Sequence, residues 1–273
     1  MKSFEGGQCV EFKFGILTNM AFDLDSVSHS EPQASPNLKN LKFRGDLVVS
    51  FLSEENTEKC FEVLVAEKDH YPGFNVLLAK SSRLFYFTNL AEHQGKKVSD
   101  CLIGKLEKKP NGKLKRVREV VELNPGFYGL SNTFLDVEWS KVKCGKQQFK
   151  EIVQSFLSSY QQLSNSARDS ENKSPNENKY ISLLDDLLDL MSRSDTFESN
   201  EDTYKPPHKN LASVFVKETD LDSTKYATRY QCAFIVRTDG KVFFKEKNFN
   251  LDLKVNSARR WETRLYEFSS TIK

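Results

Sequence analysis

The sequence holds little that points to a common enzyme, a nucleic-acid binder or a membrane protein. No stretch approaches the ~18 to 20 apolar residues of a membrane span, and residues 1–7 lack the apolar run of a signal peptide. The 40 basic and 38 acidic residues give a net charge of only +2, without the basic excess of an electrostatic nucleic-acid binder. We therefore expect a cytoplasmic protein with no nucleic-acid partner and no transmembrane segment.

Common catalytic and metal-binding patterns are also missing. The sequence has no phosphate-binding glycine loop, no HExxH, no GxSxG and no EF-hand loop. Five scattered cysteines show none of the short spacings of zinc or redox motifs, which fits a reducing compartment: Cys9, Cys60, Cys101, Cys144 and Cys232. Four histidines stand in polar surroundings without a carboxylate or cysteine at ligand spacing: His29, His70, His93 and His208. We expect no metal site, and the sequence singles out no residue as a haem axial ligand.

The chain nevertheless has ample material for a core. With 273 residues, 38% hydrophobic residues and 21 Phe, it can bury most of its apolar surface. Apolar alternation predicts strands near residues 15–19, 74–79, 83–88, 117–122, 211–216, 231–237, 241–246 and 263–268. Asp239-Gly240 lies between two of these runs and predicts a tight hairpin, because both turn positions tolerate positive φ.

Helical periodicity marks three further segments. Apolar residues at three-and-four spacing predict a helix with one apolar face, formed by Phe149, Ile152, Val153, Phe156, Tyr160 and Leu163. A second helix is predicted from Ser174-Pro175-Asn176-Glu177, which reads as a capping box. A third is expected after Arg44-Gly45-Asp46. This mixture of helices and hairpins predicts an α+β fold in a single domain over 1–273, with mobile loops near 23–40, 164–178 and 192–210.

The stretch from Phe127 to Leu135 is the most informative candidate for a site. It reads as a strand that ends in a polar tip at Ser131-Asn132, followed by a turn and the helix described above. Two further polar pairs adjoin strands, Thr18-Asn19 at a strand end and Thr228-Arg229 before another. Each could simply form a turn. Together they could line one cleft, where amides and a guanidinium would bind a carbonyl or carboxylate.

An ordered set of short motifs resembles the NRDE family of transport and Golgi organisation proteins. The set runs from about residue 5 to the C-terminus and comprises Leu17-Thr18-Asn19, Arg44-Gly45-Asp46-Leu47-Val48, Gly73-Phe74-Asn75, Tyr128-Gly129-Leu130-Ser131-Asn132, Gly145-Lys146-Gln147, Tyr226-Ala227-Thr228-Arg229, Asp239-Gly240 and Trp261-Glu262-Thr263-Arg264. The resemblance implies a four-layer αββα sandwich similar to that of N-terminal-nucleophile hydrolases. It also implies that Asn19 and Asn132 are oxyanion-side donors and that Arg229 is a clamp.

The sequence departs from the family pattern at its start. The family begins with Met-Cys and then carries an Asn-Arg-Asp-Glu motif, whereas this sequence starts at Met1-Lys2 and contains neither. Its Glu5-Gly6-Gly7 resembles the glycine pair that follows those elements. We therefore expect a sandwich that is incomplete at the N-terminus and has no nucleophile for acyl hydrolysis.

Two functions follow as hypotheses. The first is a non-catalytic trafficking or binding protein that acts in Golgi organisation and protein secretion, with partners at the Golgi or mitochondrion. Its ligand would be amphipathic and anionic, either haem as cargo or an acyl thioester, and would lie against Phe127, Tyr128 and Phe134, although core packing is the simpler role for these aromatics. The second is an N-terminal-nucleophile amidohydrolase whose nucleophile is missing here.

Overall fold

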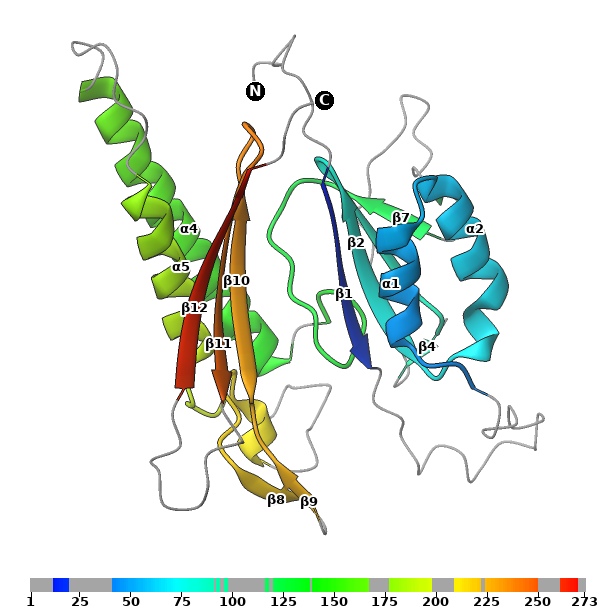
Figure 1. Ribbon diagram of the computed structural model, residues 1–273. Coiled ribbons are helices and arrows are strands. Elements are labelled where there is room, and N and C mark those ends of the chain that lie inside the picture. Colours follow the sequence, from blue (N-terminus) through cyan, green and yellow to red (C-terminus); the bar gives the residue numbers. More distant parts are fainter. Residues whose placement is uncertain are drawn as a thin grey trace. The chain divides into compact units, whose positions relative to one another are not determined.

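The computed structural model describes eleven stretches of the chain. They are residues 12–19, 41–90, 92–93, 96–97, 116–117, 120–137, 139–166, 177–197, 209–221, 224–249 and 261–269. These residues fall into two compact units, Glu11–Val137 and Glu138–Lys273 (Figure 1). Each unit has its own sheet and its own helices, and each is described in turn.

The Glu11–Val137 unit is built on a five-stranded antiparallel sheet. Its strands, in spatial order, are β1 (Lys13–Asn19), β2 (Phe74–Lys80), β3 (Arg83–Thr88), β7 (Val120–Leu123) and β6 (Arg116–Val117). Strand β2, which lies between β1 and β3, is a nearly continuous apolar run and is buried along almost its whole length. The strands predicted near 15–19, 74–79, 83–88 and 117–122 are thus confirmed, the last as two short strands.

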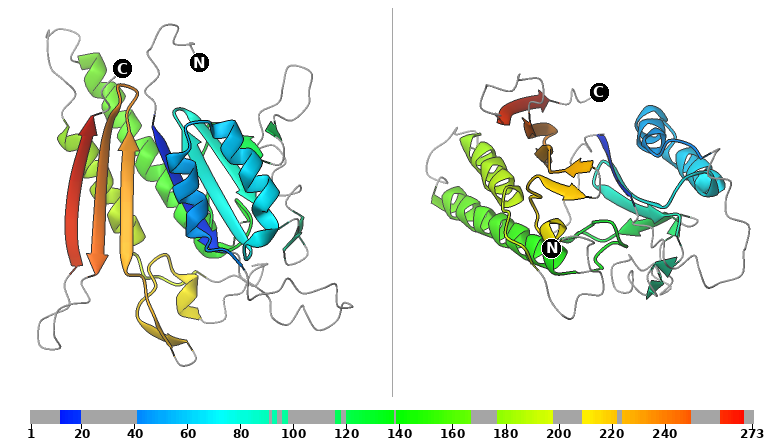
Figure 2. Two further views of the ribbon diagram at one scale, coloured as in Figure 1. Left: turned by 45° about the vertical axis from the view of Figure 1, so that its right-hand side comes forward. Right: turned by 90° about the horizontal axis from the view of Figure 1, so that it is seen from below.

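Two helices cover one face of this sheet, α1 (Gly45–Ser53) and α2 (Thr57–Glu67), followed by the 3₁₀ turn η3 (Lys68–His70) (Figures 1 and 2). The prediction of α1 is confirmed, whereas α2 was not predicted. Asn56 caps α2, since its side chain accepts a hydrogen bond from the Lys59 amide at 3.1 Å. Aromatic side chains dominate the core between helices and sheet, including Phe51, Phe61, Phe74, Phe85 and Phe87.

The Glu138–Lys273 unit holds a three-stranded antiparallel sheet in the order β10 (Tyr230–Val236), β11 (Lys241–Phe249) and β12 (Trp261–Ser269). These strands confirm the predictions near 231–237, 241–246 and 263–268. The β10–β11 turn contains Asp239 and Gly240, and Gly240 has a φ of 87°. The predicted tight hairpin is therefore confirmed, because this backbone conformation favours glycine.

Two long helices pack on one face of that sheet, α4 (Ser140–Ser166) and α5 (Asn178–Met191) (Figure 1). The predicted apolar face of α4 is confirmed, since Phe149, Ile152, Phe156 and Tyr160 pack against the core of this unit. On α5 the core residues are Tyr180, Leu183, Leu184, Leu187 and Leu188, which meet Ala233 and Phe243 of the sheet. No helix in the described stretches is both long enough and apolar enough to cross a membrane.

Smaller elements complete the described chain. They are the hairpins β4 (Glu92–His93) with β5 (Lys96–Lys97) and β8 (Thr219–Leu221) with β9 (Thr224–Tyr226), and the 3₁₀ turn η5 (Lys209–Ala212).

The strand predicted over 211–216 is wrong. The Ser213 hydroxyl lies 2.8 Å from the Asn210 carbonyl oxygen and 2.6 Å from that of Phe215, so local side-chain bonds replace a ladder. Only an isolated bridge from Thr196 to Ser213 remains.

The predicted loops are shorter than expected where the structure describes them. Residues 164–166 belong to α4 and Asn178 begins α5, so the loop predicted over 164–178 is trimmed at both ends. The loop at 23–40 and the predicted Ser174 cap lie outside the described residues, as do 198–208 within the third loop. The α+β class is confirmed. The four-layer αββα sandwich and the single domain over 1–273 stay predictions.

Candidate functional site

The chain after β7 is irregular and passes through Asn124-Pro125-Gly126. Residues 129–137 then form a closed loop, which we call the 129–137 loop. The strand predicted from Phe127 to the tip at Asn132 is therefore wrong. The Gly129 amide donates to Asp136 Oδ1 at 2.6 Å, and the Asp136 amide donates to the Gly129 carbonyl at 2.8 Å. Asp136 adopts a positive φ of 55°, a conformation that Asp tolerates better than most residues. The segment thus bonds to itself instead of extending a sheet.

A buried polar network attaches this loop to the sheet. Asn75 on β2 is fully buried, and its Nδ2 donates to the Thr133 carbonyl at 2.9 Å and to Thr18 Oγ1 at 3.2 Å. Its Oδ1 accepts a hydrogen bond from the Tyr86 hydroxyl at 2.7 Å. Thr18 Oγ1 in turn donates to the Ser131 carbonyl at 2.9 Å. One carboxamide therefore joins three strands to the loop, and satisfied buried networks of this kind specify a single conformation.

The network fixes the loop on both sides of Asn132. The Leu135 amide donates to the Tyr86 hydroxyl at 3.3 Å, and Leu135 is itself fully buried. Thr133 is 2% exposed, and its hydroxyl has no hydrogen-bond partner within the protein. Asn132, by contrast, is exposed, and its Oδ1 lies 3.4 Å from the Ser131 hydroxyl. The loop therefore presents one carboxamide to solvent from a rigid base.

The two other predicted site residues stand as follows. Asn19 is the last residue of β1, where it pairs with Phe74. Its neighbour Thr18 bonds to Ser131, so the structure brings together two of the three polar chain segments singled out from the sequence. Arg229 is exposed and belongs to the other unit, directly before β10, where its carbonyl accepts from the Phe249 amide at 2.9 Å. A cleft shared by Asn19, Asn132 and Arg229 stays a prediction.

The aromatic residues of this segment serve the core. Phe134 is 1% exposed and packs with Val137 and Leu90, and Tyr128 packs beside Leu135 and donates its hydroxyl to the Asn124 carbonyl. Burial raises the pKa of Tyr128, so its hydroxyl stays protonated as a donor. Core packing is therefore the observed role of both rings, and Phe127 is half-buried.

Sequence reasoning missed the two residues at the centre of the network, Asn75 and Tyr86. A signal was present, since Asn75 is the one polar residue in the run from Phe74 to Ala79. A carboxamide inside a strand buried on both faces needs a full set of partners. That requirement could have marked the position as the anchor of another segment.

The chemistry available at this site is mainly that of neutral hydrogen-bonding groups: carboxamides, hydroxyls, a phenol and backbone groups. The carboxylate of Asp136 is used inside the loop, where it accepts from the Gly129 amide. The described stretches contain no group of three or more His, Cys, Asp or Glu side chains that could hold a metal ion. His70 is exposed in η3, and His29 and His208 lie outside the described residues. The arrangement suits the recognition of a polar group more than proton transfer.

The described elements define an antiparallel α+β protein in which a buried polar network holds the 129–137 loop on its sheet. Comparison with known proteins gives the family: residues 7–251 match the model for "Transport and Golgi organisation 2", and the chain belongs to this family. The chain is 27% identical over 265 residues to the Transport and Golgi organization 2 homolog of Mus musculus, covering 94% of this chain and 74% of that protein. The Bos taurus homolog is 28% identical over 231 residues, covering 84% and 69%, and the Homo sapiens homolog 27% over 239 residues, covering 83% and 67%.

Proposed function

We propose that this chain is a non-catalytic binding protein that acts in Golgi transport and organisation and in protein secretion. Its ligand is amphipathic and anionic, and the exposed carboxamide of Asn132 contacts the ligand's polar group. One observation carries the proposal: the buried network of Asn75 holds the 129–137 loop on both sides of Asn132. The names of the relatives supply the link to the Golgi.

A fixed loop favours binding because less conformational freedom is lost when the ligand arrives. The main chain at Ser131, Thr133 and Leu135 is already bonded to the sheet. Fixing the backbone of one residue costs about 1–2 kcal/mol. At Asn132 this cost is met on folding, and the side-chain amide offers both a donor and an acceptor.

Arg229, in the other unit, is proposed separately as a contact for an anionic group. Its guanidinium can bind a carboxylate or phosphate through two parallel hydrogen bonds. Haem carries propionates and an acyl thioester carrier carries phosphates, so both classes suit this residue. In this proposal the protein works in the cytoplasm and associates with partners at the Golgi or mitochondrion.

Titration with haem, followed by difference absorbance, tests the proposal when it is run beside a fatty acyl thioester competitor. Saturable binding of either ligand, weakened by Arg229→Met, is the expected result. Lys217→Met is the matched control, because Lys217 is an exposed cation of the same unit. Failure of both ligands to bind would overturn the ligand assignment.

The alternative function is N-terminal-nucleophile amidohydrolysis. What favours it is that Asn132 stands on a rigid loop, as a donor to a developing oxyanion must. Incubation of the purified chain with a panel of N-acyl amides decides between the two. Turnover that is lost in Asn132→Ala would replace the binding proposal with the enzyme.

A further inference from the structure

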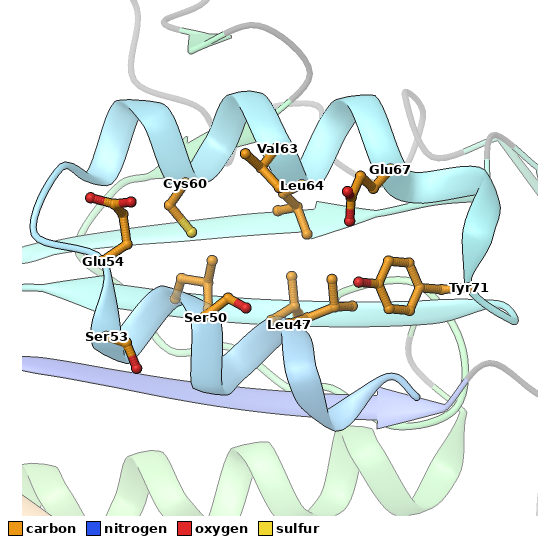
Figure 3. Close-up of a pocket in the computed structure, with 11 residues that line it drawn as sticks. Leu47, Ser50, Ser53, Glu54, Cys60, Val63, Leu64, Glu67 and Tyr71 are labelled. Atoms are coloured by element: carbon orange, nitrogen blue, oxygen red, sulfur yellow. The ribbon is translucent and has the colours of Figure 1, made fainter. Parts of the chain in front are cut away.

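A groove runs between α1 and α2 on the face of the sheet in the Glu11–Val137 unit (Figure 3). Its volume is about 340 Å³, within the range of roughly 300–1,000 Å³ that small-molecule sites occupy. The groove is separate from the 129–137 loop, since no residue of that loop lines it. It therefore needs its own explanation.

The middle of the groove is apolar. Val76 and Leu78 of β2 form its floor, and Leu47 and Leu64 stand on the two helices beside it. The Cys60 thiol also lines the groove, and burial raises its pKa, so the sulfur remains a neutral, weakly polar group. These side chains belong to the packed core, and the more accessible apolar surface of the groove comes from Val63 on α2, which is 46% exposed. A hydrocarbon chain would lie against Val63 at the mouth of the groove.

A carboxylate stands near each end of the groove. Glu54 lies between the two helices and Glu67 lies in the last turn of α2, and Figure 3 shows them at opposite ends. The length of α2 separates them by about 15 Å, at 1.5 Å per residue. Among the described residues that line the groove, these two are the charged ones. Hydrogen bonding lowers the pKa of both, through the Asn56 amide at Glu54 and through Lys42 at Glu67, so both are ionised at neutral pH.

The Glu67 end already holds an ammonium group. Lys42 Nζ lies 2.8 Å from Glu67 Oε2 and 6.0 Å from the centre of the Tyr71 ring. Both partners of this ion pair are substantially exposed, at 46% and 36%. Solvent-exposed pairs contribute little, so a ligand can compete with the lysine for the carboxylate and the ring.

We propose that the α1–α2 groove binds a single-chain amphiphilic amine, with its ammonium group at Glu67 and Tyr71 and its hydrocarbon chain along Val63 toward Cys60. Of the two carboxylates, Glu54 is paired with Lys59 at 3.3 Å, and Glu67 is the one beside an aromatic ring, so the ammonium group is assigned to the Glu67 end. A fatty acid of the same length would place its carboxylate against Glu67. This inference is independent of the function proposed for the 129–137 loop.

Calorimetric titration of the full chain with dodecylamine, dodecanoate and dodecanol tests the inference. We expect dodecylamine to bind most tightly. Glu67→Gln should weaken it about two- to fivefold, the range of one exposed ion pair. Glu58→Gln removes the same charge from the first turn of α2 outside the groove and should leave the affinity unchanged.

Lys42→Met gives the sharpest contrast. If the ligand is an amine, removing the competing lysine frees Glu67 and tightens binding. If the ligand is a carboxylate, the same change removes its counter-charge and weakens binding. Tighter binding supports the inference, and weaker or unchanged binding overturns it.

The reactivity of Cys60 reports where the hydrocarbon chain of the ligand lies. We expect bound dodecylamine to slow alkylation of Cys60, measured by mass spectrometry of its peptide. Cys232 serves as the internal control, because it is exposed in β10 of the other unit. Dodecanoate binding as tightly as dodecylamine, or an unchanged alkylation rate at Cys60, would overturn the inference.

Discussion

The two units differ in the polar contacts that join their parts. In the Glu11–Val137 unit, the contacts that attach the 129–137 loop to the sheet are neutral and buried, centred on Asn75. In the Glu138–Lys273 unit, α5 and the sheet are joined at their rim by charges: Lys241 pairs with Glu177, Lys245 with Asp185, and Lys247 with Asp189 at 3.5 Å. A satisfied network of neutral buried groups fixes one geometry. Rim charges are screened and tolerate change.

The 129–137 loop is held in one position by buried hydrogen bonds, whereas α5 is held on its sheet with ion pairs at the rim of the contact. A loop that presents a ligand contact needs the first kind of support, because a shift of its base moves the contact. The packing of α5 on its sheet depends mainly on buried leucines and Phe243, and its ion pairs add little. Four substitutions test this contrast, in order of expected effect.

The largest effect is expected for Asn75→Ala. It removes one hydrogen bond each from the Tyr86 hydroxyl, Thr18 Oγ1 and the Thr133 carbonyl, and losing the partner of a buried polar group costs about 1–3 kcal/mol. We expect a loss of about 3 kcal/mol in the free energy of unfolding, measured by urea denaturation. Ser82→Ala, in an exposed turn, is the control and should change stability by less than about 0.5 kcal/mol. A loss below 1 kcal/mol would show that the buried network does not depend on Asn75.

The second prediction concerns Lys141, a partly buried lysine of the other unit. Lys141 Nζ donates to the Leu211 carbonyl at 2.8 Å and lies 4.5 Å from the centre of the Trp139 ring, and burial lowers its pKa to about 8. Between pH 8 and 10 the unfolded chain keeps a proton that the folded chain has released. Stability therefore rises with pH in this window, by about 2 kcal/mol at 1.36 kcal/mol per unit.

Lys141→Met should abolish this rise, as measured by urea denaturation at pH 7, 8, 9 and 10. The difference between the two proteins is the relevant quantity, because buried tyrosines also titrate at high pH. Their effect has the opposite sign: burial raises the pKa of Tyr180 to about 12, so its contribution falls above pH 10. Parallel pH profiles for both proteins would refute the prediction.

A smaller effect is expected for Tyr86→Phe. The change removes the hydroxyl that donates to Asn75 and accepts from the Leu135 amide, but it keeps the ring in the core. We expect a loss of about 1–2 kcal/mol. Hydrogen exchange should show faster exchange at the Leu135 amide. Unchanged exchange there would show that Tyr86 does not hold the loop.

The smallest effect is expected for Asp185→Asn on α5, which breaks the pair with Lys245. Asp185 is half exposed, so the pair should contribute about 0.2–1 kcal/mol. The difference from the wild-type protein should shrink in 1 M salt, because salt weakens ion pairs that are partly exposed to solvent. A loss above 2 kcal/mol that persists in salt would contradict the contrast between the two units.

The sequence predicted the elements whose signals are local. The apolar run of β2, the Asp239-Gly240 hairpin and the periodic face of α4 each follow from neighbouring residues, and all three are present. The α2 helix was missed because its buried positions are only Cys60, Phe61 and Leu64 in a polar segment.

The site was harder to predict because its geometry depends on contacts distant in sequence. Asn75 and Thr133 are 58 positions apart, and nothing local to either residue indicates the other. The same holds for the shape of the 129–137 loop: aromatic residues at 127 and 128 indicated a strand, whereas Asp136 closes the chain on itself. Placing Asn132 at an exposed polar tip was right, although the strand leading to it was wrong.

The central claim is that the buried network presents Asn132 to a ligand. The most direct test is the Kd of the ligand found by titration, compared between the wild-type protein and Asn132→Ala. Because Asn132 is exposed, the substitution should leave the free energy of unfolding within about 0.5 kcal/mol of the wild-type value. We predict that the Kd of Asn132→Ala is about fivefold higher than that of the wild-type protein, which corresponds to the loss of one hydrogen bond of about 1 kcal/mol. An unchanged Kd for a fully folded Asn132→Ala variant would contradict it.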